Sequence, residues 1–271
     1  MDIRRQGIIF MNKYLKISFY LMIFGFLGLA ITVPSIAYLV YRDLPSLETL
    51  VDYKPPQSTQ VFDKNNKLVG QFFDEKRTVI DIKKLPKHVI YSFIAAEDAE
   101  FYNHKGIDIV GLARAIVLEV KYRLLGGRRV GGSTITQQTA RTMLLSSKKT
   151  YLRKLKEMVL ARKIEETLNK DQILSLYLNQ IYFGNGAYGI EEASKTYFHK
   201  PASKLEIFEA AALASIPKSP NRINPFGDIN RLKDRQKYVL EQMLKHQYLT
   251  PLEFKEAIDS PLFSEIGRAH V

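Results

Sequence analysis

The sequence predicts a mainly α-helical protein with one N-terminal transmembrane helix and a small β-hairpin region. Three observations carry this prediction: a charge-free stretch over Ile17–Tyr41, helical spacing of apolar residues from Pro86 to about Ile258, and few strand-like runs. The chain has 271 residues, of which 46% are hydrophobic. That is enough for one sizeable core plus a membrane segment, or for two small domains.

The N-terminal stretch is the most apolar part of the chain. About 20 apolar residues span a bilayer, so Ile17–Tyr41, bracketed by Lys16 and Arg42, is predicted to be a transmembrane helix. A secretory signal has a shorter apolar region, and a buried core helix is the remaining alternative. Basic residues within 1–16 predict a cytoplasmic tail, with everything after Arg42 outside.

The rest of the chain divides by composition. Residues 42–60 are rich in proline and are interpreted as a linker. Two strand-like runs flanking Lys64–Lys67 predict a hairpin at the start of a domain over 61–249. Residues 250–271 form a C-terminal segment, and Glu265–Val271, which do not continue the helical pattern, are interpreted as a cloning remnant.

Charge and cysteine usage limit the chemistry. The formal net charge of +12 favours anionic partners such as nucleic acid, lipid headgroups or phosphate-bearing substrates. The chain has no cysteine, which excludes disulfides and thiolate metal sites.

A carboxylate shares the apolar face of a helix predicted over 88–104. Glu97 follows, at i+7, the apolar residues at i, i+3 and i+4, which are Ile90, Phe93 and Ile94. Phe101 and His104 continue this face if the helix persists to Asn103. Apolar surroundings would raise the pKa of Glu97 toward the range of a general base or acid. The alternative is a glutamate at the rim of the core, paired with a cation such as Arg114.

A glycine-rich turn, Gly126–Gly132, precedes a polar run. Four glycines around two arginines suit an anion clamp or a lid, and equally an ordinary mobile loop. Ser133 or Thr134 is expected to cap the next helix, with Gln137 completing a capping box. The N-terminus of this helix, beside Arg141, predicts a phosphate site.

A second amphipathic helix is predicted over Tyr151–Leu168. Lys154 and Glu157 are spaced i, i+3 with the cation first, which is the weaker order for helix support. The pair, with Arg153 beside it, is therefore a candidate for function, and a solvated charged face is the alternative.

Five short motifs, in order over roughly Val61 to Leu249, resemble those of the family 51 peptidoglycan glycosyltransferases. They are Glu97-Asp98-x-x-Phe101-x-x-His104-x-Gly106, Gly132-Ser133-Thr134-Ile135-Thr136-Gln137-Gln138, Arg153-Lys154-x-x-Glu157, Lys170-x-x-Ile173-Leu174-x-x-Tyr177-Leu178-Asn179 and Arg235-x-x-x-Val239-Leu240. One departure is Arg141, which stands where many members have lysine. Both residues are cations, but arginine binds phosphate bidentately.

The resemblance implies a lysozyme-like fold with a groove between two lobes, and polymerisation of lipid II into β-1,4 glycan. It implies that Glu97 takes the proton from the acceptor 4-hydroxyl, which displaces undecaprenyl pyrophosphate with inversion. Glu157 is expected on the donor side, orienting Lys154 or holding a divalent ion. The residues implied in substrate binding are Asp98, Phe101, His104, Thr134, Gln137, Gln138, Arg141, Arg153, Lys154, Asn179 and Arg235, with Arg141, Arg153 and Lys154 neutralising the pyrophosphate.

The same resemblance implies no tightly bound cofactor and leaves open a divalent cation, Mg²⁺ or Mn²⁺. The implied partners are lipid II, the growing glycan strand, the bacterial inner membrane and cell-wall synthesis proteins, and not nucleic acid. It further implies that the antibiotic moenomycin targets the enzyme, and that the catalytic domain lies on the outer side of the membrane.

The linker and the stretch Tyr248-Leu249-Thr250-Pro251 resemble class A, bifunctional penicillin-binding proteins, so the chain is expected to be the N-terminal part of such a protein. Ser-x-x-Lys occurs at Ser146–Lys149 and Ser215–Lys218 without the partner motifs of a transpeptidase. Both are interpreted as coincidences.

Two other functions compete with this interpretation. Two glutamates in a lysozyme-like groove could cleave glycan, since hydrolysis needs two carboxylates that flank one glycosidic bond. The cations around Glu157 favour a pyrophosphate donor instead. A non-catalytic, membrane-anchored module that binds an acidic polymer is the second alternative.

Overall fold

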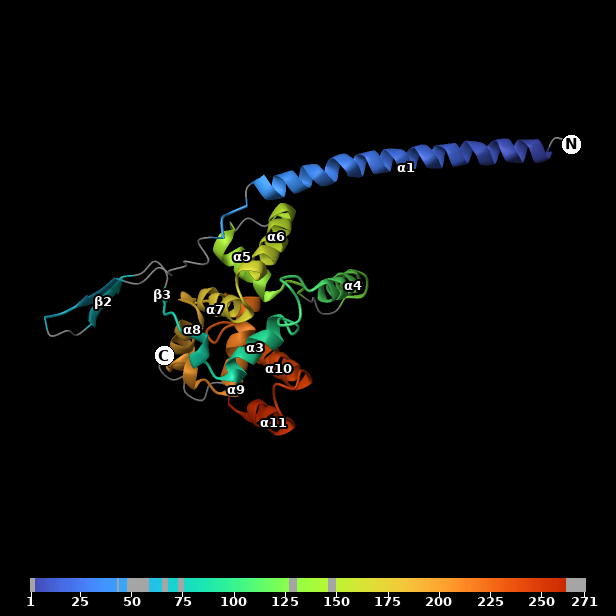
Figure 1. Ribbon diagram of the computed structural model, residues 1–271. Helices are drawn as coiled ribbons and strands as arrows, with labels where there is room; N and C mark the ends of the chain where they lie inside the picture. Colours follow the sequence, from blue (N-terminus) through green and yellow to red (C-terminus); the bar gives the residue numbers. More distant parts are fainter. Residues whose placement is uncertain are drawn as a thin grey trace. The chain divides into compact units, whose positions relative to one another are not determined.

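The computed structural model describes residues 3–42, 44–47, 59–64, 68–72, 76–126, 131–145 and 150–261 (Figure 1). The chain divides into two compact units, Met1–Pro45 and Ser46–Val271. The notebook-sized linker expected at 42–60 falls mostly outside the described residues, as do the turn at 127–130, the Ser-x-x-Lys run at 146–149 and the end of the chain from 262.

The first unit is a single long helix, α1 (Ile3–Arg42), which runs on through Pro34. Its part Lys16–Arg42 is long and apolar enough to cross a membrane, and includes the predicted span. The hydroxyls of Thr32 and Ser35 donate to carbonyls four residues earlier, so these polar groups are satisfied within the helix.

The second unit is mainly α-helical, as predicted. Its helices are α3 (Lys87–Glu97), α4 (Ile109–Leu125), α5 (Ile135–Leu144), α6 (Tyr151–Thr167), α7 (Lys170–Gln180), α8 (Ile190–Phe198), α9 (Ile207–Ser215), α10 (Ile229–Lys245) and α11 (Pro251–Asp259), with 3-10 turns η1 (Ile82–Lys84), η2 (Ala202–Lys204) and η3 (Ile216–Lys218).

The strands are short, and the predicted hairpin is confirmed. β1 (Thr59–Phe62) pairs antiparallel with β2 (Leu68–Phe72), with Thr59 opposite Phe72 and a register shift between Val61 and Phe62. β3 (Lys76–Arg77) pairs parallel with β4 (Ala187–Tyr188), which ties the start of the helical region to its middle.

The core forms around α9, whose residues from Glu209 to Ser215 are all buried. α9 packs against α3 and α10, and α5 packs against α6 and α7. Phe93 of α3 joins these groups, since its ring meets those of Tyr177 and Phe183 edge to face at 6.5 and 5.8 Å. The end of α3 and the start of α5 are thereby held by a packed interior.

The extension of the first helix to Asn103 is wrong. α3 ends at Glu97, and Asp98 takes φ −161° and ψ 73°, outside the helical region. The physical reason is that the Asp98 carboxylate turns to accept the backbone N–H of Ile135, at the first position of α5. Phe101 and His104 therefore lie in the following turn and do not extend the helix face of Glu97.

Candidate active site

Glu97 lies at the last position of α3, where the helical spacing placed it, behind the fully buried Phe93 and Ile94. Its side chain is 13% exposed. Oε2 accepts a hydrogen bond of 2.8 Å from the Gln138 amide, while Oε1 is buried and has no hydrogen-bond partner. One carboxylate oxygen is thus held in place and the other is left for a ligand.

Burial raises the pKa of Glu97 above the ordinary value of 4.5. The Gln138 hydrogen bond and the charges of Arg235, Lys218 and Arg141 act in the opposite direction but do not outweigh burial. The guanidinium of Arg235 is 3.9 Å from Oε1 and donates to the carbonyl of Ala96 at 3.3 Å. The expected pairing of Glu97 with Arg114 is wrong, because Arg114 is exposed on α4.

The two consecutive glutamines of α5 serve different partners. Gln138 holds Glu97, and the Gln137 side-chain oxygen accepts from Lys154 Nζ at 3.0 Å. Thr134 caps the helix by accepting the backbone N–H of Gln137, as expected, but the Gln137 side chain does not complete a capping box. The start of α5 therefore connects the Glu97 side of the site with the Lys154 side.

Glu157 is 1% exposed and lies between two cations. Arg153 Nε is 3.2 Å from one oxygen, and Lys154 Nζ is 3.0 Å from the other. Lys154 also donates to the Ser133 hydroxyl at 2.7 Å. The expectation that Glu157 orients Lys154 agrees with this geometry, and the solvated charged face does not.

Asp98, His104 and Thr134 connect the loop after α3 to α5. His104 Nε2 lies 3.0 Å from Asp98, whose other contact is the N–H of Ile135 at 2.9 Å. The Thr134 hydroxyl donates to the carbonyl of Gly106 at 2.7 Å. The phosphate site expected at this helix N-terminus is contradicted, because a carboxylate and a hydroxyl of the chain already occupy its N–H groups.

Two further residues expected in the site have other contacts. Phe101 is fully buried, with Lys170 Nζ 4.4 Å above its ring. Asn179 uses its amide on the backbone N–H and C=O of Ile80, at 2.9 and 3.0 Å. These two side chains support the loops and helices around the site, and no printed contact brings them to Glu97.

A divalent ion near Glu157 finds little support in the donor set. Both oxygens of Glu157 face cations, so an ion would have to displace Arg153 or Lys154. Among the described residues, no group of three or more His, Cys, Asp or Glu side chains could hold a metal. The metal remains an untested expectation, and no step below depends on it.

Two site residues were missed by sequence reasoning. Lys218 of η3 acts on the charge of Glu97, and a methyl group on Gly131 would lie 3.5 Å from its Nζ. Tyr177 of α7 is 2% exposed, its hydroxyl has no hydrogen-bond partner, and burial together with the Glu97 charge raises its pKa well above 10.0. The only sequence signals were a dismissed Ser-x-x-Lys and a motif tyrosine.

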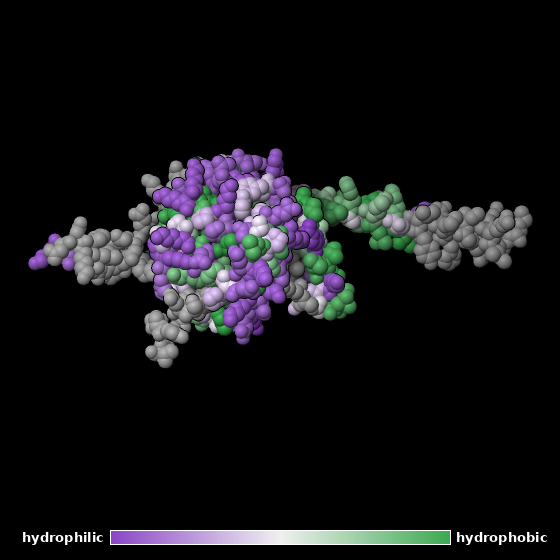
Figure 2. All heavy atoms as spheres, turned by 90° about the horizontal axis from the view of Figure 1, so that it is seen from below, coloured by the Kyte–Doolittle hydropathy of each residue, from purple (hydrophilic) through white to green (hydrophobic). Residues whose placement is uncertain are grey.

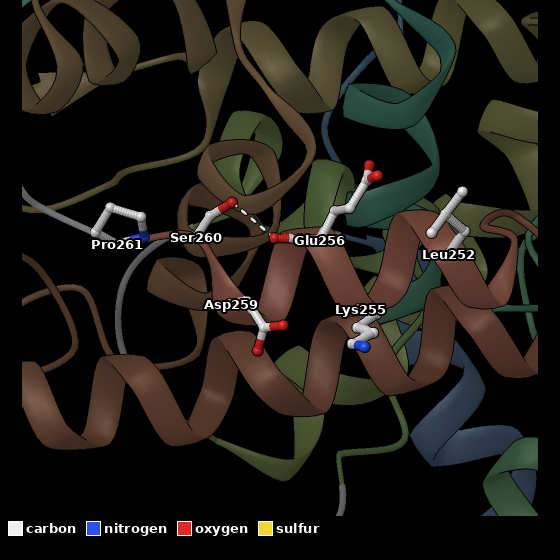
Figure 3. A pocket seen from close by; sticks show the side chains of 6 residues that line it. All are labelled: Leu252, Lys255, Glu256, Asp259, Ser260 and Pro261. Atoms are coloured by element: carbon white, nitrogen blue, oxygen red, sulfur yellow. Dashed lines mark hydrogen bonds between the residues drawn. The ribbon is translucent and has the colours of Figure 1, made fainter.

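A depression elsewhere on the surface does not belong to this site. Figure 3 shows it along α11, where it has a volume of about 490 Å³ and is lined by residues from Leu252 to Pro261. The Ser260 hydroxyl donates to the carbonyl of Glu256 at 2.7 Å within it. It is open, and none of its side chains reaches a residue described above.

The geometry defines a helical domain with one buried, half-satisfied carboxylate and a group of cations on both sides of α5. A family model described as Transglycosylase matches residues 65–244. The chain therefore belongs to the transglycosylase family, and its class is that of the peptidoglycan glycosyltransferases, as the motifs indicated.

Curated relatives agree with this assignment. The chain is 41% identical over 255 residues to penicillin-binding protein 1A of Rickettsia typhi, covering 92% of this chain and 32% of that protein. It is 44% identical over 246 residues to the protein of the same name from Aquifex aeolicus, covering 89% and 33%. The chain thus spans about a third of the length of these relatives. These relatives and helix α1 fit a membrane-anchored protein.

Among solved structures, the crystal structure of penicillin-binding protein 1A from Haemophilus influenzae is similar, with a TM-score of 0.46 and 23% sequence identity. The similarity covers 77% of this chain and 21% of that one.

Proposed function

We propose that the chain polymerises lipid II into β-1,4 glycan by an inverting displacement of undecaprenyl pyrophosphate, with Glu97 as general base. The observation that supports this most directly is the buried Oε1 of Glu97, which has no hydrogen-bond partner in a site surrounded by cations. A base of raised pKa suits proton removal from a sugar hydroxyl.

In the proposed step, the 4-hydroxyl of the acceptor sugar gives its proton to Glu97. Its oxygen forms a bond to C1 of the donor sugar on the face opposite the lipid pyrophosphate. The C1–O bond to the pyrophosphate breaks, and the bonding pair leaves with the phosphate. Charge therefore develops on the leaving group, where fixed cations lower the barrier most.

Arg141 is our candidate for the cation that receives the leaving pyrophosphate. Its charge reaches Glu97, and none of the described residues is paired with its guanidinium. Arg153 and Lys154 are already engaged with Glu157, so they set the electrostatic environment and position α6 against α5. A bidentate guanidinium suits a phosphate oxygen pair.

The hydrolase alternative is less compatible with the contacts of Glu157. Cleavage of a glycosidic bond needs a second carboxyl group that can act as acid or nucleophile. Here both oxygens of Glu157 are within 3.2 Å of a cation. The proposed orientation, with the N-terminus in the cytoplasm and the catalytic domain outside, rests on the basic residues before the span.

The proposal is tested by offering the full chain two substrates, lipid II and finished glycan strands. We expect glycan to form from lipid II with release of one undecaprenyl pyrophosphate per bond, and finished strands to remain intact. Cleavage of the strands with lipid II untouched would establish the hydrolase. Binding of either substrate without turnover would favour the non-catalytic module.

A further inference from the structure

Helix α4 presents a wide apolar face that the domain does not cover. None of its residues is buried. Six apolar side chains, each between 51% and 77% exposed, are Ile109, Val110, Ile116, Val117, Val120 and Leu124. At 3.6 residues per turn they share about a third of the helix circumference. Figure 2 shows this face as a green area over α4. An exposed patch of this kind marks a binding surface.

The opposite face of α4 is the one turned to the domain. Its residues, which include Leu112 and Ala115, are partly buried. A methyl group built on Gly132 would lie 2.7 Å from the Cβ of Ala115 and 3.9 Å from Leu112. The helix is thus seated on the segment that leads into α5, and its apolar face points away from that contact.

Cations line both borders of the apolar face. On the helical spacing, Arg114 and Lys121 follow Val110 on one border, and Arg123 precedes Ile116 on the other. All three are exposed. Arg123 is paired with Glu119 at 3.1 Å, with 73% of its own side chain exposed. An apolar face between basic borders is the pattern of a helix that lies in a membrane interface.

We propose that α4 is a second membrane contact, which lies in the plane of the bilayer surface and prefers anionic lipid. The basic borders favour lipid over a second copy of this chain, whose surface carries a net positive charge. A single anchor in α1 leaves the catalytic domain free to rotate, whereas two contacts fix which side faces the lipid.

The position of α4 in the chain gives this contact a consequence for the site. The helix joins the turn of Asp98 and His104 to the segment that carries Gln137 and Gln138. Docking of α4 would hold both ends of that connection at the membrane surface, where the lipid-linked substrate lies under the proposed function.

The test uses the absence of tryptophan from the chain. Val117→Trp on α4 and Leu252→Trp on α11 each introduce one fluorophore, at positions 67% and 66% exposed. The full chain is reconstituted in vesicles of bromine-labelled phosphatidylcholine, with or without phosphatidylglycerol. We expect blue-shifted, quenched emission from Val117→Trp, strongest with phosphatidylglycerol, and unshifted emission from Leu252→Trp.

Adding Arg114→Glu and Lys121→Glu to Val117→Trp should reduce the ratio of docked to undocked α4 by at least about fivefold per charge removed. Emission from Val117→Trp that is neither shifted nor quenched would overturn the proposal. A blue shift without quenching would assign the face to protein contact, and equal quenching in both vesicles would refute the anionic preference. The readout does not involve polymerisation, so it fails independently of the proposed function.

Discussion

At the scale of residues, the account depends on how Glu97 is kept buried. Its side chain has one good hydrogen bond, from Gln138, and a distant cation, Arg235 at 3.9 Å. Neither offsets the loss of water around the charge, because burial is the largest influence on its pKa and raises it. The protein therefore keeps a carboxylate where the charged form is costly.

This cost predicts that Glu97→Gln stabilises the fold at neutral pH. The pKa of Glu97 is raised above 4.5 in the folded state, so its contribution to stability is present below that pH and is lost as pH rises through the raised value. Thermal unfolding at pH 8 should show a higher Tm for the variant, by about 2–4 °C per kcal/mol of cost removed. At pH 4 the difference should shrink. A variant less stable than wild type at pH 8 would contradict the burial argument.

Arg141 allows a second prediction at this scale. Arg141→Ala should lower kcat for lipid II polymerisation by about 10²-fold, since it removes a cation from the developing pyrophosphate charge. Arg141→Lys keeps the charge and loses bidentate geometry, so it should stay within about tenfold of wild type. Both variants should unfold at the wild-type temperature, because no described residue pairs with this guanidinium. Wild-type turnover by Arg141→Ala would remove it from the mechanism.

At the scale of elements, α5 is the part that assembles the site. Its first turn receives Asp98 and Thr134 as caps, and its two glutamines reach Glu97 on one side and Lys154 on the other. The loop before α4 is fixed to the same place, because the carbonyl of Gly106 accepts the Thr134 hydroxyl. Displacing this loop should therefore disturb both sides of the site.

Gly106 tests this arrangement. Its φ is +85°, and an added methyl would lie 2.6 Å from the carbonyl oxygen of Ala161 on α6. Gly186 has φ +74° with open space around it, so Gly186→Ala measures the backbone cost alone, about 1–2 kcal/mol. Gly106→Ala should cost about 1–3 kcal/mol more. Equal loss of stability in denaturant unfolding of both variants would show that the close approach to α6 does not matter.

The helices could largely be predicted from apolar spacing, and their ends less well. The prediction of Tyr151–Leu168 misses α6 by one residue, because Thr150 caps it locally and Leu168 follows with extended dihedrals. The end of α3 was missed, because Asp98 leaves the helix for a partner 37 residues away. Such a contact has no signature in local sequence.

At the scale of the whole molecule, the candidate site could be predicted only in part. The helical spacing placed Glu97 on the apolar face, and the unusual order of Lys154 and Glu157 marked a real contact. Lys218 and Tyr177 were missed, since they approach Glu97 from distant elements, η3 and α7. The helix N-terminus expected to bind phosphate is filled by the chain itself, which pattern reasoning cannot foresee.

The most direct test of the central claim is the pH dependence of lipid II polymerisation by wild type, Glu97→Gln and Glu191→Gln. Glu191 is a matched control, a buried glutamate bound to the N–H of Ala202 outside the site. We predict that Glu97→Gln loses about 10²–10⁴-fold in kcat, that Glu191→Gln keeps the wild-type rate, and that the acidic limb of the wild-type profile lies above pH 4.5. Wild-type turnover by Glu97→Gln would contradict the account.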